Sequence, residues 1–257
     1  MNKVQEAKLK LHFTCGKETA KEEFDSCVRL YGQTPLKDAS AHIALGGDGT
    51  TLDVLRKQVE QNIDVPIFAL NYGTVGWLTN QKCWENLPDR IFKAQRFYVN
   101  PLQLEATLYP DGHKVRTYAF NEFSFFRGPS MQAVDLNVTT KDWIRKIRGD
   151  GVMIATPLGS NAYLKSAGGP KLPQGSNMLA IHANNATEPF SMVVPSDTVV
   201  AVGVCQHEKR PVRIECDSKV AIDSVSRAVV KLATHRRQIL LFDKERKDRF
   251  SGKIFNC

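Results

Sequence analysis

The spacing of hydrophobic residues changes once along this chain, near Pro101, and the change divides the sequence into two kinds of structure. Before it, runs suited to strands at Leu9–Phe13, His42–Leu45 and Val65–Leu70 alternate with helical spacing, which resumes from about Thr51. The first predicted helical face consists of Ala20, Phe24, Cys27, Val28 and Tyr31 and ends at Gly32. Strands that alternate with helices predict an α/β domain over residues 1–100, with a parallel sheet covered by helices.

The sequence after Pro101 is dominated by short alternating runs. These runs predict a β-rich, antiparallel, sandwich-like domain over residues 101–235, in which only Gly159–Gly168 has a helical pattern. The predicted strands are Leu102–Leu108, Val115–Phe126, Ala133–Val138, Gly151–Ala155, Val193–Val204, Val212–Ile214 and Ala228–Ala233.

The last segment, residues 236–257, contains the polar sequence DKERKDRFSGKIFN. Its composition favours a charged, solvated end of the chain. The alternative is a strap that returns to the first domain and packs on it, and this is the third element of the predicted organisation.

The composition excludes several classes of function. A net charge of +8 suits an anionic partner, but the basic residues are scattered and form no stripe with aromatic residues, so we expect no nucleic acid partner. The six cysteines form no CxxC pair and no metal-ligand spacing with histidine, which predicts reduced thiols, no protein-built metal site and a cytoplasmic location. No apolar run approaches the length of a membrane span, so no membrane association is expected.

A glycine-rich loop follows the second predicted strand. It contains Gly46, Gly47, Asp48, Gly49 and Thr50, and a helix follows at once. Glycine lets the backbone approach a ligand closely, and the amides and positive dipole at a helix N-terminus attract phosphate. The loop alone is equally compatible with a tight turn capped by Asp48 or Thr50, and it matches neither the Rossmann fingerprint nor a Walker A motif.

A second glycine-rich stretch, Asn71–Asn80, follows the third predicted strand in the same way and contains Gly73, Gly76 and Trp77. Two loops at the carboxyl edge of one parallel sheet would face a common crevice. Taken alone, these glycines are more typical of turns.

The longest polar block is RGDGVMIATPLGSNAYLKSAGGP, Arg148–Pro170. Each part has an ordinary structural interpretation. The sequence Gly149–Gly151 would suit a β-hairpin turn, and Ser160 or Asn161 would suit a helix N-cap. Together, however, so many polar groups in one strand, turn and short helix indicate a polar ligand.

Three elements in this order carry a family resemblance: GGDGT, then Asn121-Glu122, then GDGxxxxTPxGSxAYxxSAGGP. They resemble the NAD kinase family, and bacterial members in particular, over about Ala41–Pro170. GGDGT alone is less specific, because phosphofructokinase-like and lipid kinases share it. The resemblance implies an α/β N-terminal domain, a β-rich C-terminal domain, and a homodimer or homotetramer that binds NAD and ATP. The implied reaction transfers the γ-phosphoryl group of ATP to the 2′-hydroxyl of the adenosine ribose of NAD, giving NADP.

The resemblance also implies roles for individual residues. Asp48 would receive the 2′-hydroxyl and accept its proton late, because a carboxylate is too weak a base to deprotonate an alcohol before attack. Mg²⁺, or another divalent cation, would arrive with ATP. Gly46, Gly47 and Thr50 would form the phosphate loop, and Gly73, Gly76 and Trp77 the second glycine loop. The implied substrate-binding residues are Gly49, Asn121, Glu122, Arg148, Asp150, Asn161, Ala162, Tyr163 and Ser166.

Some of these positions keep an alternative interpretation. Tyr163 could be a buried core tyrosine rather than a stacking platform, and Arg148 could be merely solvated. The sequence also departs from the family pattern at Asn161, where threonine is usual, at Trp77, where phenylalanine is usual, and in the segment after Ile181. Two rival functions remain: a lipid or sugar kinase that shares the GGDGT loop, and a non-catalytic sensor that only binds NAD.

Overall fold

The computed structural model describes residues 9–128 and 132–250, and the chain divides into two units. The first unit consists of residues 1–98 and 237–257, and the second consists of residues 99–236. Within the described residues, no helix combines the length and the apolar character needed to cross a membrane.

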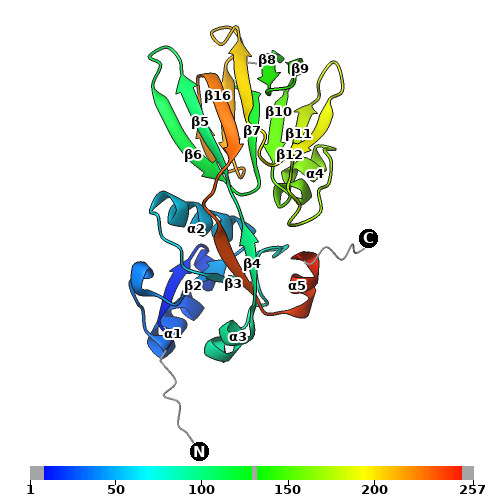
Figure 1. The fold of residues 1–257 in the computed structure, drawn as a ribbon. Helices are drawn as coiled ribbons and strands as arrows, with labels where there is room; N and C mark the ends of the chain where they lie inside the picture. The colour runs from blue at the N-terminus through cyan, green and yellow to red at the C-terminus, as the bar shows by residue number, and fades with distance from the viewer. Residues whose placement is uncertain (1–8, 129–131, 251–257) are drawn as a thin grey trace, which may run out of the picture. The chain divides into compact units, whose positions relative to one another are not determined.

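The first unit is built on a five-stranded sheet in the order β1-β2-β3-β17-β4 (Figure 1). The strands are β1 (Leu11–Cys15), β2 (Ala41–Gly46), β3 (Ile67–Asn71), β4 (Gln95–Val99) and β17 (Arg237–Leu241). The pairs β1 with β2, β2 with β3, and β3 with β17 are parallel. The helices are α1 (Lys21–Tyr31), α2 (Asp48–Glu60), α3 (Leu87–Lys93) and α5 (Lys244–Phe250). Every residue of β2 is buried, as expected for a central parallel strand covered on both faces.

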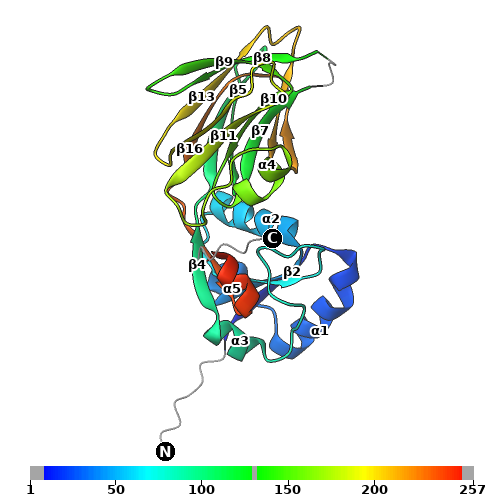
Figure 2. The same cartoon turned by 90° about the vertical axis from the view of Figure 1, so that its right-hand side faces the viewer.

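The second unit contains two six-stranded antiparallel sheets, several of whose strands are labelled in Figure 2. The first sheet consists of β6 (Lys114–Ala119), β5 (Leu102–Leu108), β16 (Val225–Leu232), β13 (Val200–Cys205), β8 (Val134–Thr139) and β9 (Ile144–Gly149) in that order. The second sheet consists of β12 (Ser191–Pro195), β11 (Met178–Asn184), β10 (Gly151–Ala155), β7 (Glu122–Arg127), β14 (Val212–Cys216) and β15 (Val220–Ile222). One apolar core joins them: Leu104 and Val202 from the first sheet pack in the same cluster as Phe123 and Val152 from the second. The predicted fold class is therefore confirmed.

A short helix, α4 (Tyr163–Ser166), covers the other face of the second sheet. Leu164 packs there in a separate small cluster with Met153, Ala155 and Ala180. Every residue of β10 is consequently buried, because this strand has packed side chains on both of its faces.

Two predicted strands of the second unit are wrong in the same way. The run Val115–Phe126 forms β6 in one sheet and β7 in the other, and the run Val193–Val204 is divided likewise between β12 and β13. In each case the apolar alternation resumes after a turn at which the chain crosses between sheets. By contrast, the predicted strands Leu102–Leu108 and Gly151–Ala155 have the bounds of β5 and β10.

The C-terminal segment contributes to the first unit. Strand β17 pairs with β3, and its neighbour Phe242 donates its backbone N–H to Asn80 Oδ1 at 2.7 Å. The carboxylate of Asp243 accepts the N–H of Gln81 at 2.6 Å and lies 3.7 Å from Arg90. The interpretation of the polar tail as only a solvated end is therefore wrong for its first residue. Residues 251–257 of that tail lie outside the described residues.

Candidate active site

The glycine-rich loop GGDGT leads directly into α2, which begins at Asp48, three residues before the predicted start. Gly47 is the N-cap residue, and no side chain caps the helix. The interpretation of Asp48 or Thr50 as an ordinary N-cap is therefore wrong. The first-turn amides and the positive end of the dipole of this 13-residue helix lie at the loop, where an anion would be stabilised.

The carboxylate of Asp48 holds the second glycine loop instead. Its Oδ1 atom accepts the backbone N–H of Leu78 at 2.6 Å, across 30 positions of sequence. Asp48 is only partly buried, and within the described residues this bond involves one of its two carboxylate oxygens. The other oxygen can therefore accept a hydrogen bond from a ligand hydroxyl.

The two glycine loops lie side by side at the carboxyl ends of β2 and β3. Tyr72 donates its backbone N–H to the carbonyl of Gly46 at 2.8 Å. A Cβ atom at Gly73 would lie 2.9 Å from the Cα atom of Gly47, so a side chain at Gly73 would force the loops apart. Gly76 has a φ of +65°, a conformation that favours glycine.

Thr50 fixes the base of the first loop. Its side chain fills the space beside Gly16 and Gly46, and a Cβ atom at either glycine would overlap it. Trp77, in the second loop, is partly buried. Thr50 thus contributes packing within the loop, in addition to any contact with phosphate.

In the second unit, Asn121 and Glu122 lie at the bend between β6 and β7, where the chain crosses from one sheet to the other. Glu122 is the first residue of β7, and Asn121 precedes it. The sequence suggested two positions within one strand, with a bulge as the means of turning both side chains inward. The structure has a bend at this point.

Glu122 is a buried carboxyl group. It is 1% exposed, and its Oε2 atom has no hydrogen-bond partner among the described residues. Burial, with a smaller contribution from the Asp217 carboxylate, raises the pKa of Glu122 to about 8. Glu122 is therefore protonated at neutral pH and can donate a hydrogen bond.

The Gly149–Gly151 segment is not a hairpin turn, because β9 belongs to the first sheet and β10 to the second. Asp150 lies at this crossing, where its carboxylate is 3.1 Å from Arg127 Nε and accepts a bond from Asn185 Nδ2 at 2.7 Å. Gly151 has a φ of +157°, and a Cβ atom there would overlap the carbonyl of Phe125. The glycine thus permits the crossing that presents Asp150.

Tyr163 is not a core residue, since it is 41% exposed. Its ring packs edge-on against Phe126, with 6.0 Å between ring centroids, which leaves part of the ring open to a ligand. Ser166 is exposed on the same short helix, and Ala162 is half-buried just before it. These residues and Asp150 are among those to which the family resemblance assigns NAD binding.

Ser160 and Asn161 do not act as helix N-caps. Ser160 donates its hydroxyl to the carbonyl of Pro157 at 2.8 Å and accepts the N–H of Leu172 at 2.9 Å. Asn161 Nδ2 makes a longer contact of 3.4 Å with the same carbonyl. Both side chains therefore stabilise the loop that precedes α4.

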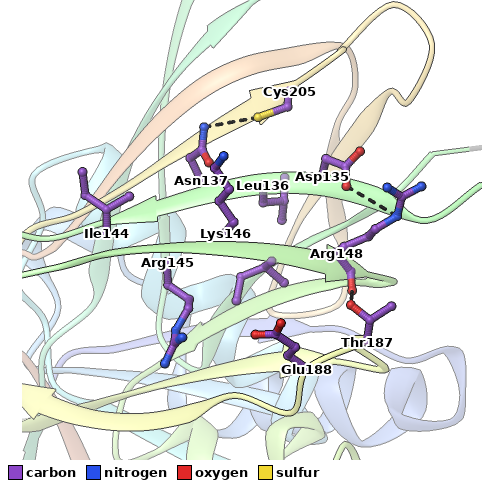
Figure 3. A pocket seen from close by; sticks show the side chains of 11 residues that line it. Asp135, Leu136, Asn137, Ile144, Arg145, Lys146, Arg148, Thr187, Glu188 and Cys205 are labelled. Carbon is purple, nitrogen blue, oxygen red and sulfur yellow. Dashed lines mark hydrogen bonds and ion pairs between the residues drawn. The ribbon is translucent and has the colours of Figure 1, made fainter.

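Arg148 forms an ion pair with Asp135 rather than with the nearby Asp150. Its Nε atom lies 3.7 Å from Asp135 Oδ1, whereas Arg127 pairs with Asp150. Arg148, Lys146 and Glu188 are among the residues that line a pocket of about 500 Å³ beside β8 and β9. Their side chains are drawn in Figure 3. Arg148 thus belongs to this surface pocket as well as to the GDG segment.

Several residues that shape the site were not identified from the sequence. Thr156 and Asp217 form hydrogen bonds with the backbone of Asn121, and Asn185 donates one to Asp150. His182 Nε2 lies 2.8 Å from the carbonyl oxygen of Ala167, at the C-terminal end of α4. Thr156 could have been found, since it lies in the TP sequence of the polar block. The others act across long sequence separations and give no local signal.

No group of three or more histidine, cysteine, aspartate or glutamate side chains within residues 9–128 and 132–250 could hold a metal ion. The chemistry of the two loops, which offer backbone amides and one carboxylate, fits a divalent cation brought by the phosphates of a nucleotide.

The comparisons with known proteins all point to the same family. Residues 3–94 match the family model of the ATP-NAD kinase N-terminal domain, and residues 120–242 match that of the C-terminal domain. The NAD kinase of Brucella suis biovar 1 (strain 1330) is 37% identical over 248 residues, covering 94% of each chain. The NAD kinase of Cereibacter sphaeroides (strain ATCC 17029 / ATH 2.4.9) is 35% identical over 228 residues, covering 87% of this chain and 88% of the relative.

Two solved structures share the fold. The crystal structure of an NAD kinase from Archaeoglobus fulgidus in complex with ATP has a TM-score of 0.72 and 21% identity, covering 95% of this chain and 96% of the other. The crystal structure of yeast NADH kinase complexed with NADH has a TM-score of 0.79 and 17% identity, covering 96% of this chain and 87% of the other.

Proposed function

This chain belongs to the NAD kinase family and phosphorylates NAD with ATP, and on that premise we propose that Asp48 receives the 2′-hydroxyl of the adenosine ribose. A carboxylate is too weak a base to remove the proton of an alcohol before attack. Asp48 orients the hydroxyl and accepts its proton as the new P–O bond forms, which suits a loose phosphoryl-transfer transition state.

The observation that supports this role is the position of the Asp48 carboxylate at the meeting point of the two glycine loops. One oxygen is fixed by the N–H of Leu78 at 2.6 Å, so the side chain has a defined orientation before substrate arrives. The start of α2 adds a positive dipole end at the same point, which attracts the phosphates. This arrangement supports a proton acceptor and a phosphate site next to each other.

We further propose that the loops hold the phosphates of ATP. The first loop contributes Gly46, Gly47 and Thr50, and the second contributes Gly73, Gly76 and Trp77. When bound, Mg²⁺ neutralises phosphate charge. Arg148 is proposed to neutralise part of the negative charge of a phosphate.

The NAD molecule is proposed to contact the residues of the second unit around the bend and α4. Asn121 and Glu122 offer hydrogen bonds to a ribose or to the adenine edge, and Tyr163 offers an open aromatic face to a base. The remaining proposed contacts are Gly49, Asp150, Asn161, Ala162 and Ser166.

We also propose that the protein works in the cytoplasm as a homodimer or homotetramer. Thiols such as those of Cys15 and Cys27, which are free, stay reduced in that compartment. Light scattering on the purified protein measures the mass of the assembly, and a monomer at working concentration would contradict this part of the proposal.

The assignment is tested by kinetics on two variants with ATP, Mg²⁺ and NAD. Asn121→Ala is expected to raise KM for NAD, and Asp48→Asn is expected to lower kcat while NAD binding by calorimetry changes little. The phosphorus NMR spectrum of the wild-type product should show a phosphate ester at the 2′ position of the adenosine ribose. An Asn121→Ala variant with the wild-type KM for NAD would contradict the NAD assignment of this bend.

A further inference from the structure

We infer that Asp217 is a positioning residue for NAD: its carboxylate fixes the bend that carries Asn121 and Glu122. The inference rests on the proposed function, in which these two residues contact NAD. Asp217 directly follows β14, and it reaches this bend from 96 positions away in sequence. It does not belong to the motifs that carry the family resemblance in this sequence, and the proposed mechanism gives it no contact with the reacting atoms.

The Asp217 carboxylate binds the N–H groups of the bend. Oδ1 accepts the backbone N–H of Asn121 at 2.7 Å, and Oδ2 accepts that of Phe120 at 3.0 Å. The backbone N–H of Asp217 donates in turn to the carbonyl of Glu122 at 3.2 Å. Asp217 is only 6% exposed, and hydrogen bonds from amides to a buried carboxylate are stronger than those between neutral groups.

The carbonyl side of the same bend is held by the TP sequence of the polar block. Thr156 donates its hydroxyl to the carbonyl of Phe120 at 2.6 Å and its N–H to that of Asn121 at 2.9 Å. A Cβ atom at Gly159 would overlap the backbone of Asn121, so the loop before α4 lies directly against the bend. The backbone N–H and C=O groups of Phe120 and Asn121 are thus all paired within the protein, which leaves the two polar side chains for a ligand.

Asp217 also acts on the charge of Glu122. Burial is the main reason that the pKa of Glu122 is raised to about 8, and the Asp217 carboxylate raises it further. On β10 the register partner of Glu122 is Ala155, whose side chain is uncharged. The bend therefore presents a neutral glutamic acid, which can donate to a ribose or adenine oxygen or nitrogen.

The test compares Asp217→Asn with the wild-type enzyme. The substitution removes one of the two amide acceptors and the charge, so KM for NAD is expected to rise about ten-fold. The KM for ATP and kcat are expected to stay within about two-fold, because the proposed function gives Asp217 no contact with ATP or the phosphoryl group. Asp223→Asn is the matched control, since Asp223 is an exposed carboxylate of the same unit that pairs with Arg213, and it should leave all three values unchanged.

The pH profile gives a readout that a merely structural role would not move. In the wild type, KM for NAD should rise above about pH 8 as Glu122 ionises, and Glu122→Gln should abolish that rise. In Asp217→Asn the rise should begin at a lower pH, because removal of the negative charge beside Glu122 lowers the pKa of that carboxyl group. A wild-type profile that stays flat to about pH 9 overturns the part of the inference that concerns the charge of Glu122, and the positioning role of Asp217 is then decided by the KM of Asp217→Asn.

The outcomes also separate this inference from the proposed function. If Asn121→Ala leaves KM for NAD unchanged, the bend does not bind NAD and the proposed function fails there. If Asn121→Ala raises KM for NAD but a folded Asp217→Asn behaves as the wild type, only the positioning role of Asp217 is overturned.

Discussion

The Oδ1 atom of Asp48 accepts the backbone N–H of Leu78 at 2.6 Å, so the carboxylate at the start of α2 also holds the second glycine loop in place. This bond gives a single side chain two functions. It fixes the loop that follows β3, and it orients the carboxylate that we assign to the acceptor hydroxyl.

The first prediction concerns the loop. In Asp48→Ala the N–H of Leu78 loses its acceptor, and its hydrogen exchange measured by NMR should become faster. In Asp48→Asn the amide oxygen can still accept the bond, so exchange should stay close to that of the wild type. Equal exchange rates in the alanine variant and the wild type would show that the bond does not hold the loop.

The second prediction concerns the contact between the loop before α4 and the bend. Gly159→Ala adds a Cβ atom that overlaps the backbone of Asn121, so the free energy of unfolding should fall by about 1–3 kcal/mol and KM for NAD should rise. Gly203→Ala is the matched control, because the atoms nearest to a Cβ there, in Asn137, are 3.9 Å away. Chemical denaturation measures both, and equal stabilities would refute the overlap.

The third prediction concerns acid stability. His42 is buried in β2, where Thr14 Oγ1 is 3.0 Å from its Nε2 and Gln58 Nε2 is 3.2 Å from its Nδ1. Burial, with a smaller contribution from His12, lowers the pKa of His42 from 6.5 to about 3. Between these pH values the unfolded chain binds a proton at His42 and the folded chain does not. Stability from this group is therefore full above about pH 6.5 and falls as the pH decreases, by up to about 1.4 kcal/mol per pH unit.

Urea denaturation at a series of pH values measures this dependence. His42→Asn should be less stable at neutral pH but should show a shallower loss of stability towards acid. His113→Asn is the control, since His113 is exposed in a loop. A slope for His42→Asn that equals the wild-type slope would show that His42 is not the group that titrates.

The fourth prediction concerns the open face of Tyr163. Removal of the ring in Tyr163→Ala should raise KM for NAD by about 2- to 10-fold, which corresponds to the usual strength of an aromatic contact. Tyr163→Phe keeps the ring and should bind NAD nearly as well as the wild type. Tyr109→Ala, at another exposed aromatic residue of the same unit, should leave KM for NAD unchanged. If all three variants have the wild-type KM, Tyr163 does not stack on NAD.

Local sequence patterns predicted those parts of the fold that depend on neighbouring residues. The helical face that ends at Gly32 corresponds to α1, and the run Gly151–Ala155 corresponds to β10. The pattern did not show where the chain changes sheets. The bend at Asn121 depends on Asp217 and Thr156, which are distant in sequence, so the apolar alternation on either side of it was taken as one run.

In the candidate site, too, local features could be predicted from the sequence and contacts between distant residues could not. Motifs led to the prediction of Asp48 and the residues around Asp150 as site residues, because glycine and polar residues in a fixed order are visible in a single sequence. Nothing local pointed to Asn185 or to the N–H of Leu78, since these groups reach the site through tertiary structure. Strand β17 was missed for the same reason, because its place beside β3 is set by a parallel partner far earlier in the chain.

The most direct test of the assignment is the single-turnover rate of phosphoryl transfer in Asp48→Asn, measured with saturating NAD, ATP and Mg²⁺. Asparagine keeps the bond to Leu78 but cannot accept the proton of the hydroxyl, so the rate should fall by about 10²- to 10⁴-fold. NAD affinity should change little, and Asp53→Asn, on the same helix, should retain the wild-type rate. A rate in Asp48→Asn within a few-fold of the wild type would contradict the role of Asp48 as the proton acceptor.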